Sequence, residues 1–311
     1  MSPLGRTALA RAVVLVCLMQ VALAGNQAIP ALQAAVDRAM ASKRGTVVVL
    51  EVASGRVLAA YRLDIAARRI AYPGSSIKPF TLLALLQTAH LDPHLAVACK
   101  RPLNIAGHRL ACSHPDTHQP LDAPTALAYS CNSYFTTVAT RLSPEQLRNA
   151  MIREGLTSTT GIAPNEAVGA VAQASSREQL QLQAIGEWGV QVTPLELLRA
   201  YRSLAFVTAS DASIAPIFEG LQGSTQYGMA RPAQPEHGIR VAGKTGTAAA
   251  EEGPWTHGWF AGFAPAEKPE IVLVVFLEKG RGSDAAEIAQ QIFAKWDETN
   301  ADKRAAVSKA K

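Results

Sequence analysis

Residues 46–61 read TVVVLEVASGRVLAAY, a run of β-branched and apolar residues that is interrupted only by a turn-forming stretch at 53–55. This pattern predicts two strands, 46–52 and 56–61, joined as a β-hairpin. Three more strand-forming runs occur only toward the other end of the chain, at 238–242, 259–264 and 271–276. The segment 80–203 is mostly helical in pattern, so strands and helices do not alternate as in a βαβ fold. We therefore expect an α+β fold with a mainly antiparallel sheet.

Two amphipathic helices are expected at the ends of this arrangement. Residues 29–41 and 283–296 both carry apolar side chains at helical spacing, and we expect them to cover one face of the sheet. A helical insertion would then lie beside the sheet. The predicted organisation is one domain at 25–297, with a sheet lobe at about 25–72 and 215–297, a helical lobe at about 80–210, and a basic tail at 298–311.

The first residues have the pattern of a secretory signal peptide. Arg6 and Arg11 precede an apolar run at 12–24, which closes on Ala22-Leu23-Ala24. A basic start, a short apolar stretch and a small-residue end are typical of a cleaved leader. We expect residues 1–24 to be removed, leaving a periplasmic or extracytoplasmic protein with no stable membrane span; a retained anchor is the alternative.

Composition excludes several classes of protein. Of 311 residues 48% are hydrophobic and 18% charged, which is incompatible with a disordered chain, a collagen-like fibre or a small disulfide-stapled domain. The formal net charge is +5, and two of these charges belong to the predicted leader. Composition therefore gives no reason to expect a nucleic-acid partner.

Three cysteines remain after the predicted cleavage. Cys99 and Cys112 bracket a polar loop, and closing such a loop suits a disulfide in an oxidising compartment. Zinc is the alternative, because His114 and His118 follow Cys112, but this spacing is not among the usual zinc patterns. We expect a Cys99–Cys112 disulfide, no metal site and no cofactor.

The first motif whose residues could take part in catalysis is PGSSIKPF at 73–80. If a helix starts near Ser75, the side chain of Lys78 shares its face. A serine hydroxyl is a poor nucleophile until a base removes its proton, and a buried lysine with a lowered pKa can do so. On its own the motif equally suits a capped surface helix.

The second motif is Ser130-Cys131-Asn132. On an irregular segment its two polar side chains can point the same way, one carrying a proton and the other binding a substrate amide. A helix cap or turn is the simpler interpretation of this motif in isolation, with Cys131 as a packing residue.

The third motif is Lys244-Thr245-Gly246-Thr247, expected at the end of the strand that leads from Gly238. Lys244 and the two threonine hydroxyls can bind a carboxylate, and Gly246 lacks the side chain that would block an extended peptide. The simpler interpretation is a β-turn beside a charge.

Together and in this order, the three motifs resemble those of the penicillin-binding protein transpeptidase and serine β-lactamase superfamily. The flanking segments PGSSIKPF, YSCNSYF and AGKTGTA are more similar to transpeptidases than to β-lactamases. The similarity spans roughly 44–296. It implies a five-stranded antiparallel sheet covered by helices, with a helical subdomain and the site between them.

By this resemblance, Ser75 would attack the carbonyl between the two terminal D-alanines of a peptidoglycan stem peptide and form an acyl-enzyme. Lys78 would act as general base, and Ser130 would pass the proton to the departing D-alanine. β-Lactams mimic this D-Ala-D-Ala end, so penicillin is expected to acylate Ser75.

The resemblance also implies the groups that bind substrate. Asn132 would hold the amide of the acyl side chain, while Lys244, Thr245 and Thr247 would bind the terminal carboxylate. Backbone N–H groups of Ser75 and Thr247 would form the oxyanion hole.

Two rival functions carry the same motifs. A serine β-lactamase must also hydrolyse its acyl-enzyme, yet no glutamate between the second and third motifs opens an E-x-x-L-N segment, and class D enzymes usually carry an aliphatic residue where Asn132 stands. A non-catalytic β-lactam sensor is the second rival. We expect no glycosyltransferase region, pedestal domain or retained anchor, and therefore a carboxypeptidase, a specialised cross-linker, or an enzyme that needs a protein partner for localisation.

Overall fold

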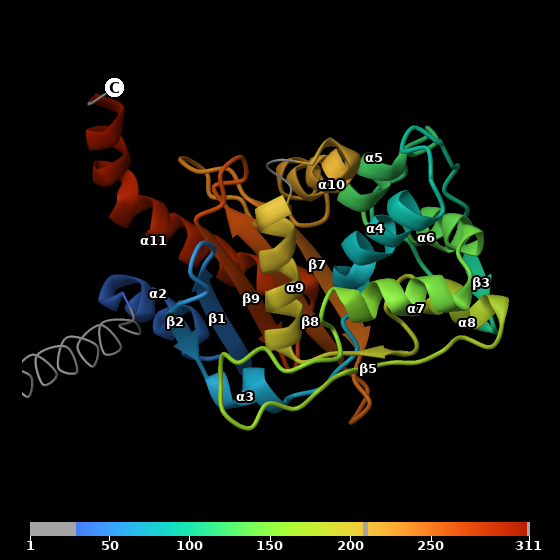
Figure 1. Ribbon diagram of the computed structural model, residues 1–311, viewed down its shortest axis with the longest axis horizontal. Helices are drawn as coiled ribbons and strands as arrows, with labels where there is room; N and C mark the ends of the chain where they lie inside the picture. Colours follow the sequence, from blue (N-terminus) through green and yellow to red (C-terminus); the bar gives the residue numbers. More distant parts are fainter. Residues whose placement is uncertain (1–28, 208–210, 310–311) are drawn as a thin grey trace, which may run out of the picture.

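The computed structural model describes residues 29–207 and 211–309 (Figure 1). The predicted signal peptide at 1–24 lies outside the described residues. Within them, no helix combines the length and the apolar character that a membrane crossing requires.

A five-stranded sheet forms the centre of the molecule, with the strand order β2-β1-β9-β8-β7 and every neighbouring pair antiparallel. The chain thus enters the sheet through one hairpin and returns to it only after the helical region, as the sequence pattern predicts. The five strands are β1 (Gly45–Glu51), β2 (Val57–Tyr61), β7 (Ala242–Ala249), β8 (Thr256–Ala264) and β9 (Ile271–Leu277). The α+β fold with a five-stranded antiparallel sheet is confirmed.

The third predicted strand was wrong in its position. Residues 238–241 are not part of the sheet, and β7 begins only at Ala242. Gly238 has a left-handed φ of +89°, and the Ile239 N–H donates to Asp297 Oδ2 at 3.1 Å. The side chain of Gln234 accepts from the Val241 N–H at 3.0 Å and donates to the Ile239 carbonyl at 2.8 Å. Side chains therefore take the backbone groups that a strand would offer to its neighbour.

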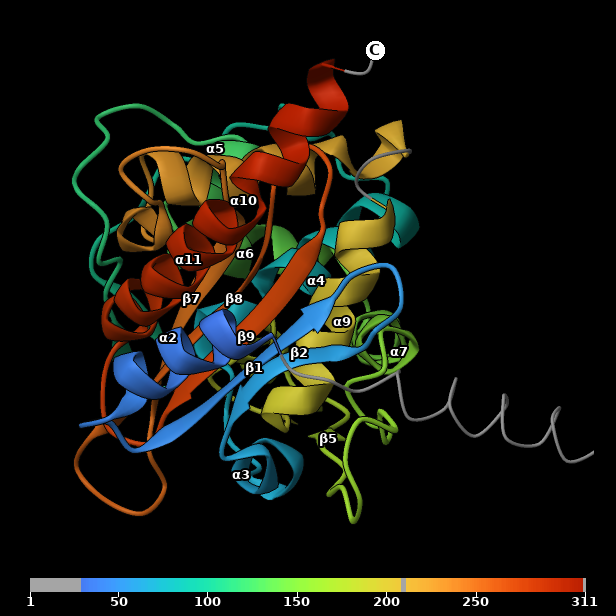
Figure 2. The same ribbon diagram turned by 90° about the vertical axis from the view of Figure 1, so that its left-hand side faces the viewer.

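The first and last described helices cover one face of the sheet, as predicted. These are α2 (Pro30–Met40) and α11 (Gly282–Lys309), which lie side by side in front of the strands in Figure 2. Because side chains alternate along a strand, Leu273 and Val275 of β9 point to this face and pack with Ile292 and Phe293 of α11. The helix continues to Lys309 and so includes residues 298–309 of the predicted basic tail.

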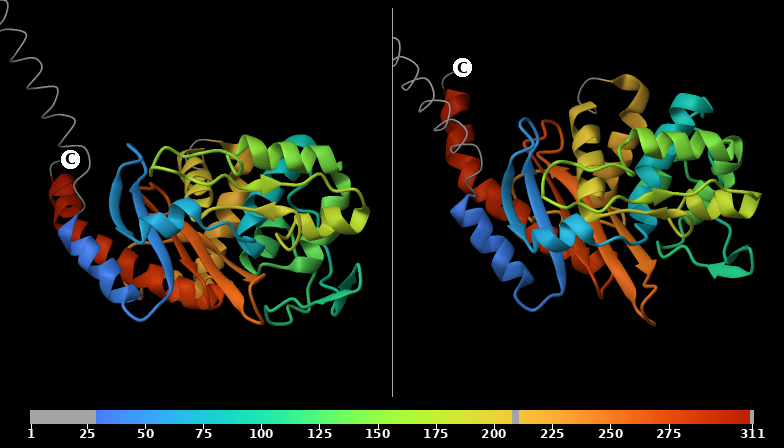
Figure 3. Two further views of the ribbon diagram at one scale, coloured as in Figure 1. Left: turned by 90° about the horizontal axis from the view of Figure 1, so that it is seen from below. Right: turned by 60° about the horizontal axis from the view of Figure 1, so that its bottom comes forward.

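The opposite face of the sheet supports the helical region. Val272, Val274 and Phe276 alternate with the residues just described and pack into a second core. This core includes residues of α4 (Lys78–Thr88) and α9 (Pro194–Val207). Figure 3 shows the sheet between these helices on one side and the α2–α11 pair on the other. Both faces are buried, which explains why β9 is apolar at every position.

The remaining elements lie mostly in the helical region. Side chains cap the starts of α5, α6, α7 and α8; in α7, Ser143 and Gln146 form a reciprocal capping box. The short hairpin β3–β4 and the two-stranded antiparallel pair β5–β6, whose strands flank α8, were not predicted. The bounds are α3 (Leu63–Arg68), η2 (Gly74–Ile77), β3 (Leu103–Ile105), β4 (His108–Leu110), α5 (Ala123–Ala128), α6 (Asn132–Val138), η3 (Ala139–Arg141), α7 (Pro144–Arg153), β5 (Ala170–Val171), α8 (Arg177–Gln183), β6 (Val190–Gln191), η4 (Ala212–Ile214), α10 (Ala215–Gln226) and η5 (Arg231–Ala233).

This packing predicts a large stability loss for truncations in β9. Leu273→Ala leaves a cavity under α11, and we expect the free energy of unfolding to fall by about 2–5 kcal/mol. Val168→Ala, at an exposed position, is the matched control and should change it by less than about 0.5 kcal/mol. Urea titration followed by circular dichroism measures both; equal losses would contradict the arrangement of this core.

Candidate active site

The first motif forms a tight helical turn against the sheet edge. Residues Gly74–Ile77 are a 3₁₀ turn that leads directly into α4, and the Lys78 N–H donates to the Ser75 carbonyl. In this geometry residues three apart lie on one face, so Ser75 and Lys78 are neighbours. Gly74 adopts a left-handed φ of +51°, and a Cβ there would come within 2.5 Å of the Thr247 carbonyl oxygen. Glycine is therefore required before the serine.

The second motif surrounds the amine of Lys78. Its Nζ donates to the Ser130 carbonyl at 2.7 Å, to Ser130 Oγ at 3.2 Å and to Asn132 Oδ1 at 2.6 Å. The Lys78 side chain is completely buried, and burial lowers its pKa to about 8. Part of the lysine is thus neutral near physiological pH and able to accept a proton.

An irregular turn aims both polar side chains of the second motif at Lys78. Helix α5 ends at Ala128, Ser130 has a left-handed φ of +56°, and Cys131 caps the start of α6. The turn thereby brings Ser130 and Asn132 to the same side. The buried Cys131 side chain packs in the core, as expected.

The third motif lies inside β7, the edge strand, directly against the first. A Cβ on Gly246 would collide with the Pro73 carbonyl oxygen and come within 3.0 Å of the Ser76 backbone nitrogen. We expected Gly246 to leave space for a peptide. The structure shows that the first motif fills this space, so Gly246 permits the approach of the two motifs.

Lys244 is the second fully buried lysine of this region. Its Nζ donates to the Thr245 carbonyl at 3.1 Å. Burial lowers the pKa of Lys244 well below its usual value, and the positive charge of Lys78 lowers it further. Both lysines are therefore removed from water, and each holds its proton less firmly than an exposed lysine does.

The two threonines of the motif differ in exposure. Thr247 is exposed, and its Oγ1 accepts from the Gly282 N–H at 2.9 Å, so the hydroxyl hydrogen can point toward a ligand. The side chain of Thr245 is nearly buried beside Gly282. The structure therefore gives Thr247 the better position for contact with a ligand.

Sequence reasoning missed two residues that hold the first motif in place. Tyr201 of α9 donates from its hydroxyl to the Ser76 carbonyl at 2.8 Å, and Trp259 of β8 donates from Nε1 to the Tyr72 carbonyl at 3.0 Å. Both lie more than 100 residues from the segment that they bind. Only their aromatic character within apolar runs was visible in the sequence, and this predicts core packing rather than a partner.

The predicted Cys99–Cys112 disulfide is wrong in this structure, where both residues are free thiols. The β3–β4 hairpin brings the two sulfurs within 4.8 Å of each other without a bond, in a cluster that they share with two other side chains. Cys112 Sγ lies 3.9 Å from Cys131 Sγ, and Cys99 Sγ lies 3.6 Å from His114 Nε2.

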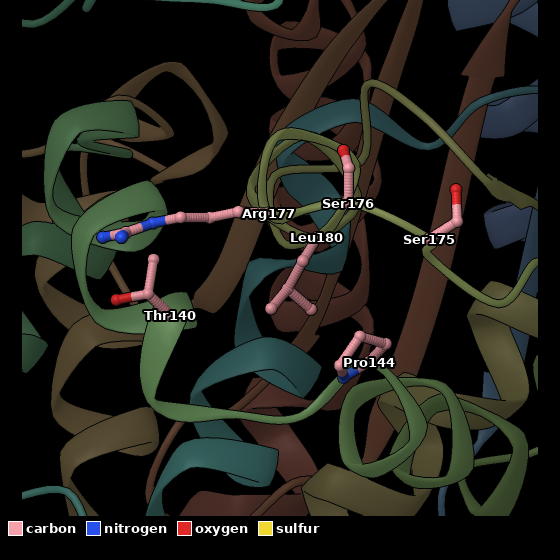
Figure 4. Close-up of a pocket in the computed structure, with 6 residues that line it drawn as sticks. All are labelled: Thr140, Pro144, Ser175, Ser176, Arg177 and Leu180. Atoms are coloured by element: carbon pink, nitrogen blue, oxygen red, sulfur yellow. The ribbon is translucent and has the colours of Figure 1, made fainter.

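A hollow of about 390 Å³ elsewhere on the surface does not belong to this site (Figure 4). None of the residues of the three motifs lines it, and its walls come from η3, α7 and the start of α8. Its lining residues are Thr140, Pro144, Ser175, Ser176, Arg177 and Leu180.

Comparison with known proteins agrees with the geometry of the three motifs. The family described as the penicillin-binding protein transpeptidase domain matches residues 45–296. The chain belongs to this family. The match includes all three motifs and all five strands of the sheet.

Curated relatives of the transpeptidase domain are longer proteins. The chain is 26% identical over 286 residues to peptidoglycan D,D-transpeptidase MrdA of Acinetobacter baumannii, with 72% of this chain and 42% of MrdA covered. It is 27% identical over 258 residues to stage V sporulation protein D of Bacillus subtilis, with 68% and 38% covered. The chain thus spans about two fifths of each of these relatives.

Solved structures share the fold at lower identity. Penicillin-binding protein 2 of Pseudomonas aeruginosa, in complex with WCK 5153, superposes with a TM-score of 0.74 at 23% identity, covering 85% of this chain and 76% of that one. The transpeptidase domain of penicillin-binding protein 3 from Burkholderia pseudomallei gives a TM-score of 0.75 at 20% identity, covering 86% and 94%.

The hydroxyl of Tyr201 offers a test of how the first motif is positioned. Tyr201→Phe leaves the buried Ser76 carbonyl without this donor, and we expect about 1–3 kcal/mol lower stability and slower acylation by penicillin. Tyr61→Phe, on the opposite edge strand β2, is the matched control and should leave acylation unchanged. Stopped-flow acylation and urea unfolding measure the two effects; unchanged acylation in Tyr201→Phe would show that this bond does not position Ser75.

Proposed function

We propose that this chain is a penicillin-binding serine D,D-transpeptidase or D,D-carboxypeptidase that acts on the D-Ala-D-Ala ends of peptidoglycan stem peptides. The observation that carries the proposal is the buried Lys78 amine, hydrogen-bonded to Ser130 and Asn132 and one helical turn after Ser75. This arrangement supplies a nucleophile, a base and a proton carrier within one cluster.

Acylation begins when neutral Lys78 takes the proton of the Ser75 hydroxyl. Ser75 Oγ then bonds to the carbonyl carbon between the two D-alanines, and the resulting oxyanion is stabilised by the backbone N–H groups of Ser75 and Thr247. The proton passes from Lys78 through Ser130 Oγ to the leaving nitrogen, and D-alanine departs. The 3.2 Å contact between Lys78 Nζ and Ser130 Oγ supports this route. An amine or water later releases the acyl group from Ser75.

Lys244 and Thr247 are suited to bind the carboxylate of the terminal D-alanine. A carboxylate favours the charged form of a nearby lysine, so its arrival raises the pKa that burial had lowered in Lys244. The Thr247 hydroxyl can donate a hydrogen bond at the same place. Thr245 is assigned to this carboxylate by family resemblance, and Asn132 to the amide of the acyl side chain.

The proposal also includes the location of the enzyme, its substrates, its inhibitors and a protein partner. A cleaved signal peptide exports the enzyme, which acts on peptidoglycan stem peptides outside the cytoplasm. β-Lactams are its inhibitors. A structural neighbour, penicillin-binding protein 2 of Helicobacter pylori, was solved in complex with MreC at a TM-score of 0.76, 20% identity, covering 86% of this chain and 62% of that one. We include a protein partner for localisation in the proposal.

Two acidic residues between the second and third motifs have structural contacts that do not favour a β-lactamase. Glu166 accepts from the backbone N–H of Ala163, and Glu196 accepts from the backbone N–H groups of Gly169 and Thr193. These carboxylates hold loops in place. A class A β-lactamase uses a glutamate as the base that hydrolyses its acyl-enzyme, and these two carboxylates are committed to loop backbones instead.

Labelled penicillin tests the nucleophile. Wild-type protein should bind one label per chain, and Ser75→Ala should bind none, because the attacking oxygen is removed. Ser76→Ala is the matched control: its hydroxyl bonds to the Pro73 carbonyl at 2.8 Å, and the variant should still be labelled. Peptide mapping by mass spectrometry locates the label; a label retained in Ser75→Ala would remove this residue from its role.

The fate of the label distinguishes the rival functions. Slow release together with turnover of a D-Ala-D-Ala peptide supports the proposal. Release within seconds would identify a β-lactamase, and stable labelling without peptide turnover would identify a sensor.

The lowered pKa of Lys78 predicts a pH dependence of acylation. Only the neutral amine accepts a proton, so the acylation rate should rise with pH through about 8 and then level off. Lys78→Arg keeps the charge but has no accessible neutral form, so acylation should be lost at every pH. Lys295→Arg, beside Glu298, is the control and should keep the wild-type profile. A profile that is flat between pH 6 and 9 would contradict Lys78 as the base.

A further inference from the structure

Four potential metal ligands meet beside the second motif and have no part in the proposed reaction. They are Cys99, Cys112, His114 and Cys131, and one ligand atom from each lies within 4.8 Å of all the others. Cys131 is completely buried, and Cys112 and His114 are 8% and 2% exposed. Three thiols and an imidazole that converge in a largely buried place form the donor set of structural zinc sites.

The spacing of these atoms approaches that of a tetrahedral site. With Zn–S bonds of about 2.3 Å and a Zn–N bond of about 2.0 Å, the edges of such a tetrahedron measure about 3.5–3.8 Å. The Cys112–Cys131 sulfur distance is 3.9 Å, and Cys99 Sγ lies 3.6 Å from His114 Nε2. Bonded disulfide sulfurs would be about 2.05 Å apart.

The groups around the cluster suit thiolates and a neutral histidine. His114 Nδ1 lies 2.7 Å from the Pro115 carbonyl, an acceptor that suits a hydrogen on Nδ1 and a lone pair on Nε2. Arg101 Nη2 lies 2.7 Å from Nδ1 and 3.2 Å from Nε2, so this guanidinium nitrogen has to move off Nε2 when a cation binds there. The Tyr134 N–H donates to Cys131 Sγ at 3.4 Å, and Arg101 Nε donates to Cys99 Sγ at 3.4 Å. The guanidinium also offsets the negative charge that three thiolates leave around a divalent cation.

We propose that Cys99, Cys112, His114 and Cys131 form a structural Zn²⁺ site that fastens the β3–β4 hairpin to the second motif. The ion replaces the three thiol protons, which leave to solvent, and His114 binds through the Nε2 lone pair. The sequence suggested a zinc spacing that used His118, but that side chain is exposed beside Asp116. The fourth ligand is Cys131, which comes from the other side of the cluster.

Such an ion would act directly on the geometry of the proposed active site. Cys131 stands between Ser130 and Asn132, the two residues that bind the Lys78 amine. The hairpin already contacts this motif: Asn132 Nδ2 donates to the Ala111 carbonyl at 3.2 Å, and the Lys100 N–H donates to Ser133 Oγ at 3.0 Å. A metal at the junction would hold the whole turn in one conformation.

The test uses the full chain, purified without chelator and analysed for metal by mass spectrometry. We expect one zinc per chain, and Co²⁺ substitution should give the visible absorption of a tetrahedral thiolate site. Cys99→Ser and Cys131→Ser should each weaken zinc binding by at least about 100-fold. Loss of a group that only hydrogen-bonds to a metal ligand already costs about 10–100-fold in affinity, and here a ligand itself is lost. His118→Ala, on the same loop, is the matched control and should keep the metal.

A further variant keeps the proposal testable if Cys99→Ser and Cys131→Ser fail to fold. Cys99 is only partly buried, so Cys99→His can replace sulfur by nitrogen; it should retain Co²⁺ with a weaker sulfur-to-metal band. A chain without zinc that fails to take up Co²⁺ under reducing conditions, or one with a Cys112–Cys131 disulfide and no metal, would overturn the proposal. These readouts need no catalysis, so they remain valid even if the penicillin-labelling experiment fails.

Discussion

The amine of Lys78 is completely buried, and the surrounding fold has to compensate for removing it from water. Three oxygen atoms of Ser130 and Asn132 do so through hydrogen bonds of 2.6–3.2 Å. This constraint requires a helix start, an irregular turn and an edge strand to meet at one point, although more than 160 residues separate the first from the last. The same burial lowers the lysine pKa, so one interaction provides both the geometry and the base.

The sheet makes this meeting possible because it is rigid and buried on both faces. Its edge strand β7 lies so close to the turn of the first motif that neither Gly74 nor Gly246 can carry a side chain. Tyr201 reaches the same turn from α9, on the helical side. The nucleophile is therefore held between two layers of the fold, where a small shift of either layer would move Ser75 relative to Lys78.

Much of this could be predicted from local sequence, and the failures have identifiable causes. Four of five strands and both flanking helices follow from periodicity, because both faces of the sheet are apolar and its hairpin is marked by a turn. The strand predicted at 238–242 failed because the distant side chain of Asp297 takes its backbone donor. The disulfide prediction considered only the pair Cys99 and Cys112, whereas the fold also brings Cys131 and His114 to these sulfurs and leaves the thiols free. Contacts between residues far apart in the sequence decide where β7 begins and which groups the cysteines meet.

The turn at Ser130 connects the proposed chemistry with the cysteine cluster. A serine with φ of +56° occupies a region that costs about 1–2 kcal/mol for residues with a Cβ, and such a conformation persists only when its surroundings enforce it. On one side, Lys78 binds the carbonyl and hydroxyl of Ser130. On the other side, the next residue, Cys131, is anchored among thiols and His114. Because the backbone between these anchors is a single peptide unit, tightening the cluster would also fix the hydroxyl that carries the proton to the leaving group.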